Sequence, residues 1–272
     1  MNRIENDIAA CFYKTDAVRA FVEEVCRTAK AHPEAIQPFN GESPGTSEIF
    51  SSAGLTLLST VEHTTLVASG CGRYFFKILH ALTLKARIKN LVTDKAKSLC
   101  RLSEKLRAGG IGVPEVEAWG TLYNGRRRFF VMSRVAGESL YDVSVRKGRR
   151  VPVEIYRRVM DEVLKLHAMG YLMGDAHPSH VFIFEGRVSG IIDIDGIRRN
   201  LPVMPGLQPL SLRGIARDLA GLNHPGLLLD EAQRAAILQY YIRRCDPRVR
   251  KAHEKLRKYF KTYSERRWKA QA

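Results

Sequence analysis

Two carboxylates lie eighteen positions apart in the segment YLMGDAHPSHVFIFEGRVSGIIDIDG, residues 171–196. Asp175 follows a predicted helix, and Asp193 ends the second of two short predicted strands, with His180 between the two acids. Because the strands form a tight hairpin, both acids lie at loop ends and can converge on one point. One carboxylate can accept a hydroxyl proton while the other holds Mg²⁺ against phosphates, which is the minimum apparatus for phosphoryl transfer.

Hydrophobic periodicity predicts the elements that position these acids. Residues 153–170 form a helix whose apolar face carries Ile155, Val159, Val163 and Leu166. Residues 180–184 and 188–195 are the two strands, and long amphipathic helices run from about Leu212 to the end. The second half of the chain is therefore mostly helical and holds one short β-hairpin.

The first half of the chain has a β-rich pattern. Residues 49–78 are rich in Leu, Val and Thr and include a hairpin turn at 69–72 and a strand at 73–78. A helix is expected over 82–110, followed by strands at 114–119 and 129–135. An earlier helix is expected at 16–30, with Asp16 as N-cap and an apolar face of Val18, Phe21, Val22 and Val25. This order of elements indicates two lobes.

The segment DAHPSHVFIF…IIDID resembles the D-x-H-P-x-N-hydrophobic…I-D-F/W pattern of the aminoglycoside and choline kinase-like branch of the kinase superfamily. It is most similar to that of the bacterial lipopolysaccharide core kinases, which phosphorylate heptose or Kdo, and the resemblance runs from about Val67 to Leu222. It implies an α+β, bilobal protein-kinase-like fold with a β-rich N-lobe and a helical C-lobe. The expected parts are an N-terminal helical extension (1–45), the N-lobe (46–135) and a C-lobe with basic C-terminal helices (136–272).

The resemblance implies that Asp175 is the catalytic base and Asp193 the Mg²⁺-binding acid. Asp195, followed by Gly196, is the alternative to Asp193. His180 stands where many relatives have Asn, and it can either complete the metal shell or hydrogen-bond Asp175. Imidazole is a poor Mg²⁺ ligand beside oxygen donors, so the number of metal ions stays open. His177, which precedes a proline, is expected to shape the loop or to take part in catalysis.

The strand GRYFFKI resembles the G-x-Y-F-V-K strand of the same kinases, which implies that Lys77 binds the α- and β-phosphates of ATP and takes part in catalysis. The helical glutamate that pairs with such a lysine is expected at Glu104, with Asp94 as the alternative and a surface role for Glu104 equally open. The expected glycine-rich phosphate loop is missing, because residues 57–64 contain no glycine.

The strand FFVMSRVAGESL resembles the hinge of these kinases. It implies that Met132 lies at the back of an adenine pocket, that the backbone of Ser133 and Val135 bonds adenine, and that Glu138 reaches the ribose. Farther along, GIARDLAGL resembles a helix start whose aspartate, Asp218 here, braces the loop of the catalytic base through its backbone.

The composition favours an anionic partner. The formal net charge is +16, and residues 243–272 hold twelve Lys or Arg against three Asp or Glu. Further basic clusters lie at 126–128 and 146–150. The expected partners are an anionic lipopolysaccharide core acceptor and the cytoplasmic membrane surface, with nucleic acid disfavoured for want of a recognised fold signature. No signal peptide or spanning segment is visible, so we expect a cytoplasmic protein that is peripheral to the inner membrane.

These observations favour an ATP- and Mg²⁺-dependent kinase that phosphorylates a sugar hydroxyl, heptose being the expected acceptor, of the lipopolysaccharide inner core. The alternatives are a small-molecule or protein kinase of the same fold, a nucleotide-binding pseudokinase and a nucleic-acid-binding module. Five scattered cysteines without CxxC spacing argue against a zinc site or a disulfide framework.

Overall fold

The computed structural model describes residues 8–32, 46–61, 64–80, 95–122, 127–199 and 211–269. The chain divides into two compact units: unit 1 comprises Met1–Glu104 and Pro114–Arg134, and unit 2 comprises Lys105–Val113 and Val135–Ala272. The first part of the helix expected at 82–110, the alternative acid Asp94 and part of the expected phosphate loop lie outside the described residues.

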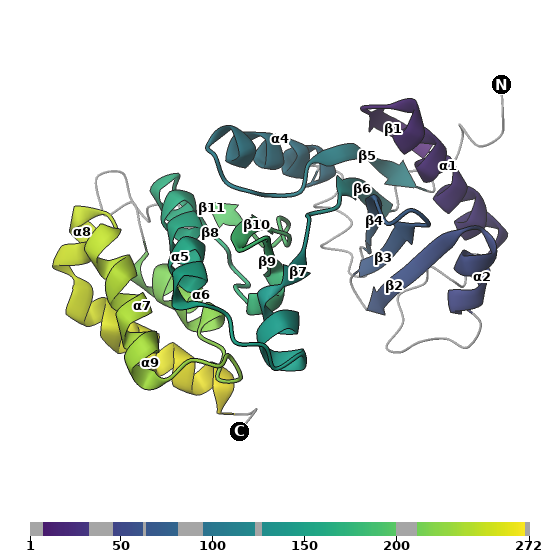
Figure 1. The fold of residues 1–272 in the computed structure, drawn as a ribbon. Helices are drawn as coiled ribbons and strands as arrows, with labels where there is room; N and C mark the ends of the chain where they lie inside the picture. The colour runs from purple at the N-terminus through teal and green to yellow at the C-terminus, as the bar shows by residue number, and fades with distance from the viewer. Residues whose placement is uncertain are drawn as a thin grey trace. The chain divides into compact units, whose positions relative to one another are not determined.

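Unit 1 is built on a six-stranded antiparallel sheet with the strand order β1-β5-β6-β4-β3-β2 (Figure 1). The strands are β1 (Ile8–Tyr13), β2 (Leu55–Val61), β3 (Thr64–Ser69), β4 (Tyr74–Leu79), β5 (Val116–Leu122) and β6 (Arg127–Ser133). The predicted turn at 69–72 joins β3 to β4, with the Gly72 N–H donating to the Ser69 carbonyl at 2.7 Å. The β-rich pattern of the first half is therefore confirmed from Leu55 onward, whereas residues 49–52 lie in a helix (Thr46–Ser52) and not in a strand.

One face of this sheet packs against α1 (Asp16–Ala31) and α2 (Thr46–Ser52). The four residues predicted for the apolar face of the first helix are all buried in this core. The N-cap is Thr15 and not Asp16, because the Thr15 hydroxyl accepts the Val18 N–H at 3.3 Å. Since β1 pairs with β5, the segment expected as an N-terminal extension contributes a strand and a helix to unit 1. The boundary between the two units falls within α4 (Lys95–Ala108), which ends just before Gly109 and Gly110.

Unit 2 is mostly helical. Its helices are α5 (Val153–Ala168), α6 (Leu212–Leu222), α7 (Glu231–Arg244), α8 (Pro247–Lys251) and α9 (His253–Trp268), with a π-helical turn at Asp142–Arg146. Helix α5 packs on α7 and α6 packs on α9 (Figure 1). The predicted apolar face of α5 is buried throughout.

Two small antiparallel sheets complete unit 2. One has the order β10-β9-β7, from β7 (Glu138–Ser139), β9 (Val181–Phe184) and β10 (Arg187–Ile191), and the other pairs β8 (Tyr171–Leu172) with β11 (Arg198–Arg199). The predicted hairpin is thus present, although its second strand ends at Ile191, two residues before Asp193. The protein is a mixed α/β protein with antiparallel sheets and helices, and the bilobal kinase fold stays a prediction. In the described part of the chain, no helix has the length and apolar character needed to span a bilayer.

Candidate functional site

Asp218, which is only 1% exposed, stabilises the loop that carries Asp175. The Asp218 carboxylate accepts the backbone N–H groups of Met173 at 2.7 Å and Gly174 at 3.1 Å. It also contacts Nε2 of His167 at 3.1 Å, and Nδ1 of that ring lies 2.7 Å from the Tyr241 hydroxyl. A carboxylate only accepts, so Nε2 of His167 carries the hydrogen and, in the neutral ring, Nδ1 accepts from the Tyr241 hydroxyl. Burial raises the pKa of Tyr241 well above its usual range. The expected bracing role of Asp218 is confirmed.

Glycines allow the same loop to approach its neighbours closely. A Cβ on Gly221, in α6, would lie 2.1 Å from the Ala176 carbonyl oxygen. Gly174 has a φ of +79°, and a Cβ there would lie 2.3 Å from the Gly196 carbonyl oxygen. The backbone around Asp175 is therefore held against α6 on one side and against the turn after Asp193 on the other.

His180 links the surroundings of the two predicted acids. Its ring Nδ1 lies 2.9 Å from the main-chain carbonyl oxygen of Asp175, and its own carbonyl accepts the Ile192 N–H at 2.9 Å. A carbonyl only accepts, so Nδ1 carries the hydrogen and, in the neutral ring, Nε2 is the acceptor. The expected hydrogen bond from His180 thus reaches the backbone of Asp175 and not its carboxylate. Asp175, His180 and Asp193 lie in one hydrogen-bonded group of loops.

Asp193 follows β10 in a tight turn, with its carbonyl accepting the Gly196 N–H at 3.2 Å. Its side chain and that of Asp195 are both partly exposed. A Cβ on Gly196 would lie 2.8 Å from Asp193 Oδ2, so only glycine leaves this carboxylate its present place. The structure records this close approach for Asp193, and the choice between Asp193 and Asp195 as the metal-binding acid stays a prediction.

His177 shapes the loop, which is the structural one of its two expected roles. Its Nδ1 accepts the Ser179 N–H at 3.1 Å and lies 2.7 Å from the Ser179 hydroxyl, capping the 3-10 turn Pro178–His180. The ring packs 5.2 Å from that of Tyr141 and 5.5 Å from that of His224. Burial, with help from the neighbouring His180, lowers the pKa of His177 to about 4.

Lys77 lies in the middle of β4, opposite Leu66 of β3 and Phe130 of β6. The even-numbered residues of β4, Tyr74, Phe76 and Ile78, all face the core that contains α1. Because side chains alternate along a strand, Lys77 points to the other face of the sheet, where it is half-buried. Unit 1 thus presents this lysine on the face away from α1.

Glu104 is exposed on α4. Its Oε1 accepts a hydrogen bond from the Cys100 thiol one turn earlier, at 3.6 Å. Burial, followed by the nearby Glu104 charge, raises the pKa of Cys100 to about 11, so the thiol keeps the proton that it donates. This local contact within α4 is what the structure records for Glu104, and its pairing with Lys77 stays a prediction.

The expected hinge begins in β6. Met132 is half-buried and pairs with Phe75 on the Lys77 face of the sheet. The Ser133 N–H donates to the Glu115 carbonyl at 2.9 Å, and the Ser133 hydroxyl accepts the Glu115 N–H at 3.0 Å. In this structure the Ser133 N–H is therefore engaged with the Glu115 backbone, just before β5. The adenine contact expected from the Ser133 backbone stays a prediction.

The remaining two hinge residues belong to unit 2. The half-buried Val135 lies against Gly190 of β10, where an added Cβ would be 3.1 Å from Val135 Cγ1. The Glu138 carboxylate accepts hydrogen bonds from Lys147 and, at 3.2 Å, from Arg149. The hydrogen bond from Lys147 is the main reason that the pKa of Glu138 is lowered. A ribose contact would have to share Glu138 with these two cations.

The hairpin of β2 and β3 stands where a glycine-rich loop was expected. Two hydroxyls of this hairpin, those of Ser59 and Thr60, could assist phosphate binding without glycine, and Ser59 is exposed. The Thr60 hydroxyl is buried and has no hydrogen-bond partner among the described residues. A buried polar atom without a partner is a candidate for a ligand contact.

Arg267 is a residue of this region that sequence reasoning did not single out. One of its terminal guanidinium nitrogens donates to Asp175 Oδ1 at 3.0 Å, across 92 positions of sequence. The only sequence signal for Arg267 was its place in the basic segment 243–272, and that signal did not distinguish it from the other basic residues there. Trp268, the next residue, was missed for the same reason.

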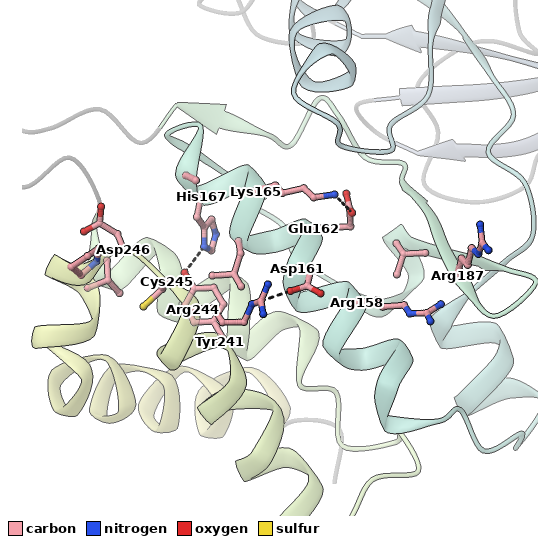
Figure 2. Close-up of a pocket in the computed structure, with 15 residues that line it drawn as sticks. Arg158, Asp161, Glu162, Lys165, His167, Arg187, Tyr241, Arg244, Cys245 and Asp246 are labelled. Atoms are coloured by element: carbon pink, nitrogen blue, oxygen red, sulfur yellow. Dashed lines mark hydrogen bonds and ion pairs between the residues drawn. The ribbon is translucent and has the colours of Figure 1, made fainter.

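A separate cavity of about 990 Å³ lies between α5, β10, α7 and α8 (Figure 2). Its charges are largely paired, since Arg244 bonds Asp161 at 3.4 Å and Lys165 bonds Glu162 at 2.7 Å. His167 and Tyr241 form its inner wall. None of the predicted site residues lines this cavity, so we do not place the chemistry there.

Asp193 is the acid predicted to bind Mg²⁺, and its side chain is partly exposed. In the parts of the chain that the structure describes, no group of three or more His, Cys, Asp or Glu side chains is arranged to hold a metal ion. Mg²⁺ usually takes only one or two protein carboxylates and fills its shell with phosphate oxygens and water. The partly exposed Asp193 carboxylate matches that pattern.

Comparison with known proteins does not identify a family for this chain. No protein-family model matches the chain, and no curated protein does. Two similar solved structures are of WbdD, one of the monomeric protein and one of the "bifunctional kinase-methyltransferase". They share 18% and 15% identity over 61% and 78% of this chain, with TM-scores of 0.42 and 0.44. The chain spans 37% and 47% of those proteins.

Proposed function

We propose that this chain is an ATP-dependent kinase that phosphorylates a sugar hydroxyl, that of a heptose, in the lipopolysaccharide inner core. The supporting observation is the braced group of loops in unit 2. It holds an exposed carboxylate, Asp175, and a second carboxylate, Asp193, on backbones that are tied together through His180. Phosphoryl transfer depends mostly on positioning and on charge neutralisation, which such a rigid pair of acids can supply.

Each residue has a distinct role in this proposal. Asp175 accepts the proton of the acceptor hydroxyl, and its 67% exposed side chain is open to a substrate. Asp193 holds Mg²⁺, which neutralises phosphate charge when bound, while Lys77 binds the ATP phosphates. His180 orients the Asp175 backbone, and its Nε2 is the atom available toward a metal or a phosphate. Glu104 stays the proposed partner of Lys77.

The adenosine end of ATP is assigned to the hinge. Met132 is proposed to contact the adenine ring, and the backbone of Val135 to bond it. The Ser133 carbonyl is the remaining backbone group of that residue, since its N–H is engaged in the sheet. Glu138 is proposed to reach the ribose in competition with Lys147 and Arg149.

The proposed acceptor and location follow from charge. The segment 243–272 carries +9, from twelve basic and three acidic residues. Each basic residue near an anionic membrane contributes about 1 kcal/mol to binding. We propose that this segment attracts the anionic acceptor and the cytoplasmic membrane surface.

A transfer assay tests the proposal. Purified protein with radiolabelled ATP, Mg²⁺ and dephosphorylated core lipopolysaccharide is expected to label the lipopolysaccharide. Asp175→Asn is expected to reduce the rate by about a hundredfold or more, because the proton acceptor is lost. The matched control is Asp161→Asn, an identical change in the separate cavity of unit 2, which is expected to keep the rate. Label on protein, or ATP binding without turnover on any acceptor, would contradict the proposal and favour a protein kinase or a pseudokinase.

A second pair of variants separates the two candidate metal-binding acids. Asp193→Asn is expected to raise the Mg²⁺ concentration needed for half-maximal rate and to lower the maximal rate, because one carboxylate of the metal shell is removed. Asp195→Asn, two positions away, is expected to leave the Mg²⁺ dependence unchanged. The reverse result would transfer the metal role to Asp195.

A further inference from the structure

The end of α9 is anchored beside the loop of Asp175. Trp268 is 8% exposed, and its indole N–H donates to the Ala220 carbonyl at 3.0 Å. Its ring lies 4.6 Å from that of His224 and 6.0 Å from that of His177. Burying an aromatic ring and satisfying its polar atom fixes the backbone that carries it. The position of the preceding residue, Arg267, is therefore determined by packing and not by a free chain end.

Arg267 extends from this anchor to the exposed acid. Its guanidinium donates to Asp175 Oδ1 at 3.0 Å, and the two side chains are 33% and 67% exposed. A guanidinium has five N–H donors arranged for two-pronged contact with oxyanions. The ion pair between Arg267 and Asp175 is exposed to solvent, and such pairs contribute only about 0–1 kcal/mol to stability. Arg267 can therefore exchange Asp175 for another anion at little cost.

Two further arginines lie along the same pair of helices. Arg213 lies over the ring of Tyr259 at 5.4 Å, and Arg217 lies over that of Tyr263 at 5.1 Å. From the first pair to the second, the residue number rises by four on α6 and also by four on α9, so the two helices run parallel to each other. Tyr259, Tyr263 and Arg267 succeed one another at four-residue spacing on α9, which places them along one side of the helix. A line of positive charge thus leads along α6 and α9 toward Asp175.

We infer that Arg267 is a specificity-determining residue which selects an acceptor carrying a phosphate group near the hydroxyl to be phosphorylated. This inference rests on the proposed kinase function for its acceptor hydroxyl. When such an acceptor binds, its phosphate replaces Asp175 as the partner of Arg267, and the freed carboxylate faces the hydroxyl. A phosphate suits the line of arginines better than a carboxylate does, because it is dianionic near neutral pH.

The first test measures binding and needs no turnover. The chain has two tryptophans, so a Trp119→Phe background leaves Trp268 as the only indole reporter. Titration with inorganic phosphate is expected to change Trp268 fluorescence in a saturable way. Arg267→Ala is expected to weaken this binding by about tenfold or more, because a charge-assisted hydrogen bond is lost. Arg266→Ala removes the same charge from the neighbouring exposed position and is expected to alter binding by about twofold or less.

The second test measures selection. With phosphorylated and dephosphorylated core lipopolysaccharide as acceptors, the unmodified protein is expected to show the lower KM for the phosphorylated one. Arg267→Ala is expected to raise that KM by about tenfold with little change in kcat. Phosphate binding that is unaffected by Arg267→Ala, or no phosphate binding at all, would overturn the inference. A fall in kcat alone in Arg267→Ala would show that Arg267 only positions Asp175. A rise in the rate of ATP hydrolysis without acceptor would show that Arg267 inhibits the unliganded protein. Either result would overturn the inference. Phosphate binding at Arg267 without any phosphoryl transfer would instead refute the proposed kinase function alone.

Discussion

Two aspartates of unit 2 serve the same loop in opposite environments. Asp218 is 1% exposed and bonds two backbone N–H groups and one imidazole, whereas the Asp175 side chain is 67% exposed and pairs with Arg267. Burial makes the hydrogen bonds of Asp218 costly to lose, while solvent makes the pairing of Asp175 easy to exchange. The comparison indicates that the first acid contributes to the stability of the loop and that the second is available for chemistry.

Replacement of the two acids is expected to give the largest difference in the free energy of unfolding. Asp218→Ala leaves two buried donors and one half-buried donor without an acceptor and is expected to lower the free energy of unfolding by about 3–5 kcal/mol. Asp175→Ala is expected to change it by about 0.5 kcal/mol or less, because the side chain is exposed. Urea unfolding followed by circular dichroism measures both variants. Equal losses of stability would remove the contrast between the two acids.

The close approach of α6 to the loop can be tested at a single glycine. Gly221→Ala places a methyl group 2.1 Å from the rigid Ala176 carbonyl and is expected to cost about 1–3 kcal/mol of unfolding free energy. Gly214→Ala, also on α6, meets the Leu172 side chain at 2.3 Å, which can rotate away, so its cost should be smaller. Comparison of the urea midpoints checks this order, and a larger loss in Gly214→Ala would contradict it.

The pH dependence of the free energy of unfolding should report on His177, which packs within the same loop. Because the pKa of His177 in the folded protein is about 4, the unfolded chain, with an ordinary value of about 6.5, binds this proton first as the pH falls. The stabilisation is complete above about pH 6.5 and is lost as the pH falls from there toward 4. Since the ring is partly exposed, we expect a loss of about 1–2 kcal/mol.

The matched variant for this pH effect is His177→Asn, which keeps an acceptor for the Ser179 N–H and removes the titrating group. Its free energy of unfolding is expected to fall less steeply than that of the unmodified protein between pH 6.5 and 4. The exposed His253→Asn serves as the control and should retain the full slope. Identical slopes in all three proteins would exclude His177 as the source.

The sequence predicted most of the local elements, because their signals are local. The hairpin turn at 69–72 and the apolar faces of the helices at 16–30 and 153–170 follow from residue type and periodicity over a few turns. The predicted bracing by Asp218 also agreed with the structure, since its motif specifies a backbone contact. The errors were also local: Thr15 caps α1 in place of Asp16, and residues 49–52 belong to α2 and not to a strand.

By itself, the sequence determined the approximate extent of most helices and strands, the acid that follows the second strand of the hairpin and the excess of basic residues. Only the tertiary structure decided that Arg267 contacts Asp175 and that His167 and Asp218 share a buried network. The physical reason is separation along the chain. Contacts across 51 or 92 positions depend on how α5, α6 and α9 pack, and no local pattern of residue types encodes that packing.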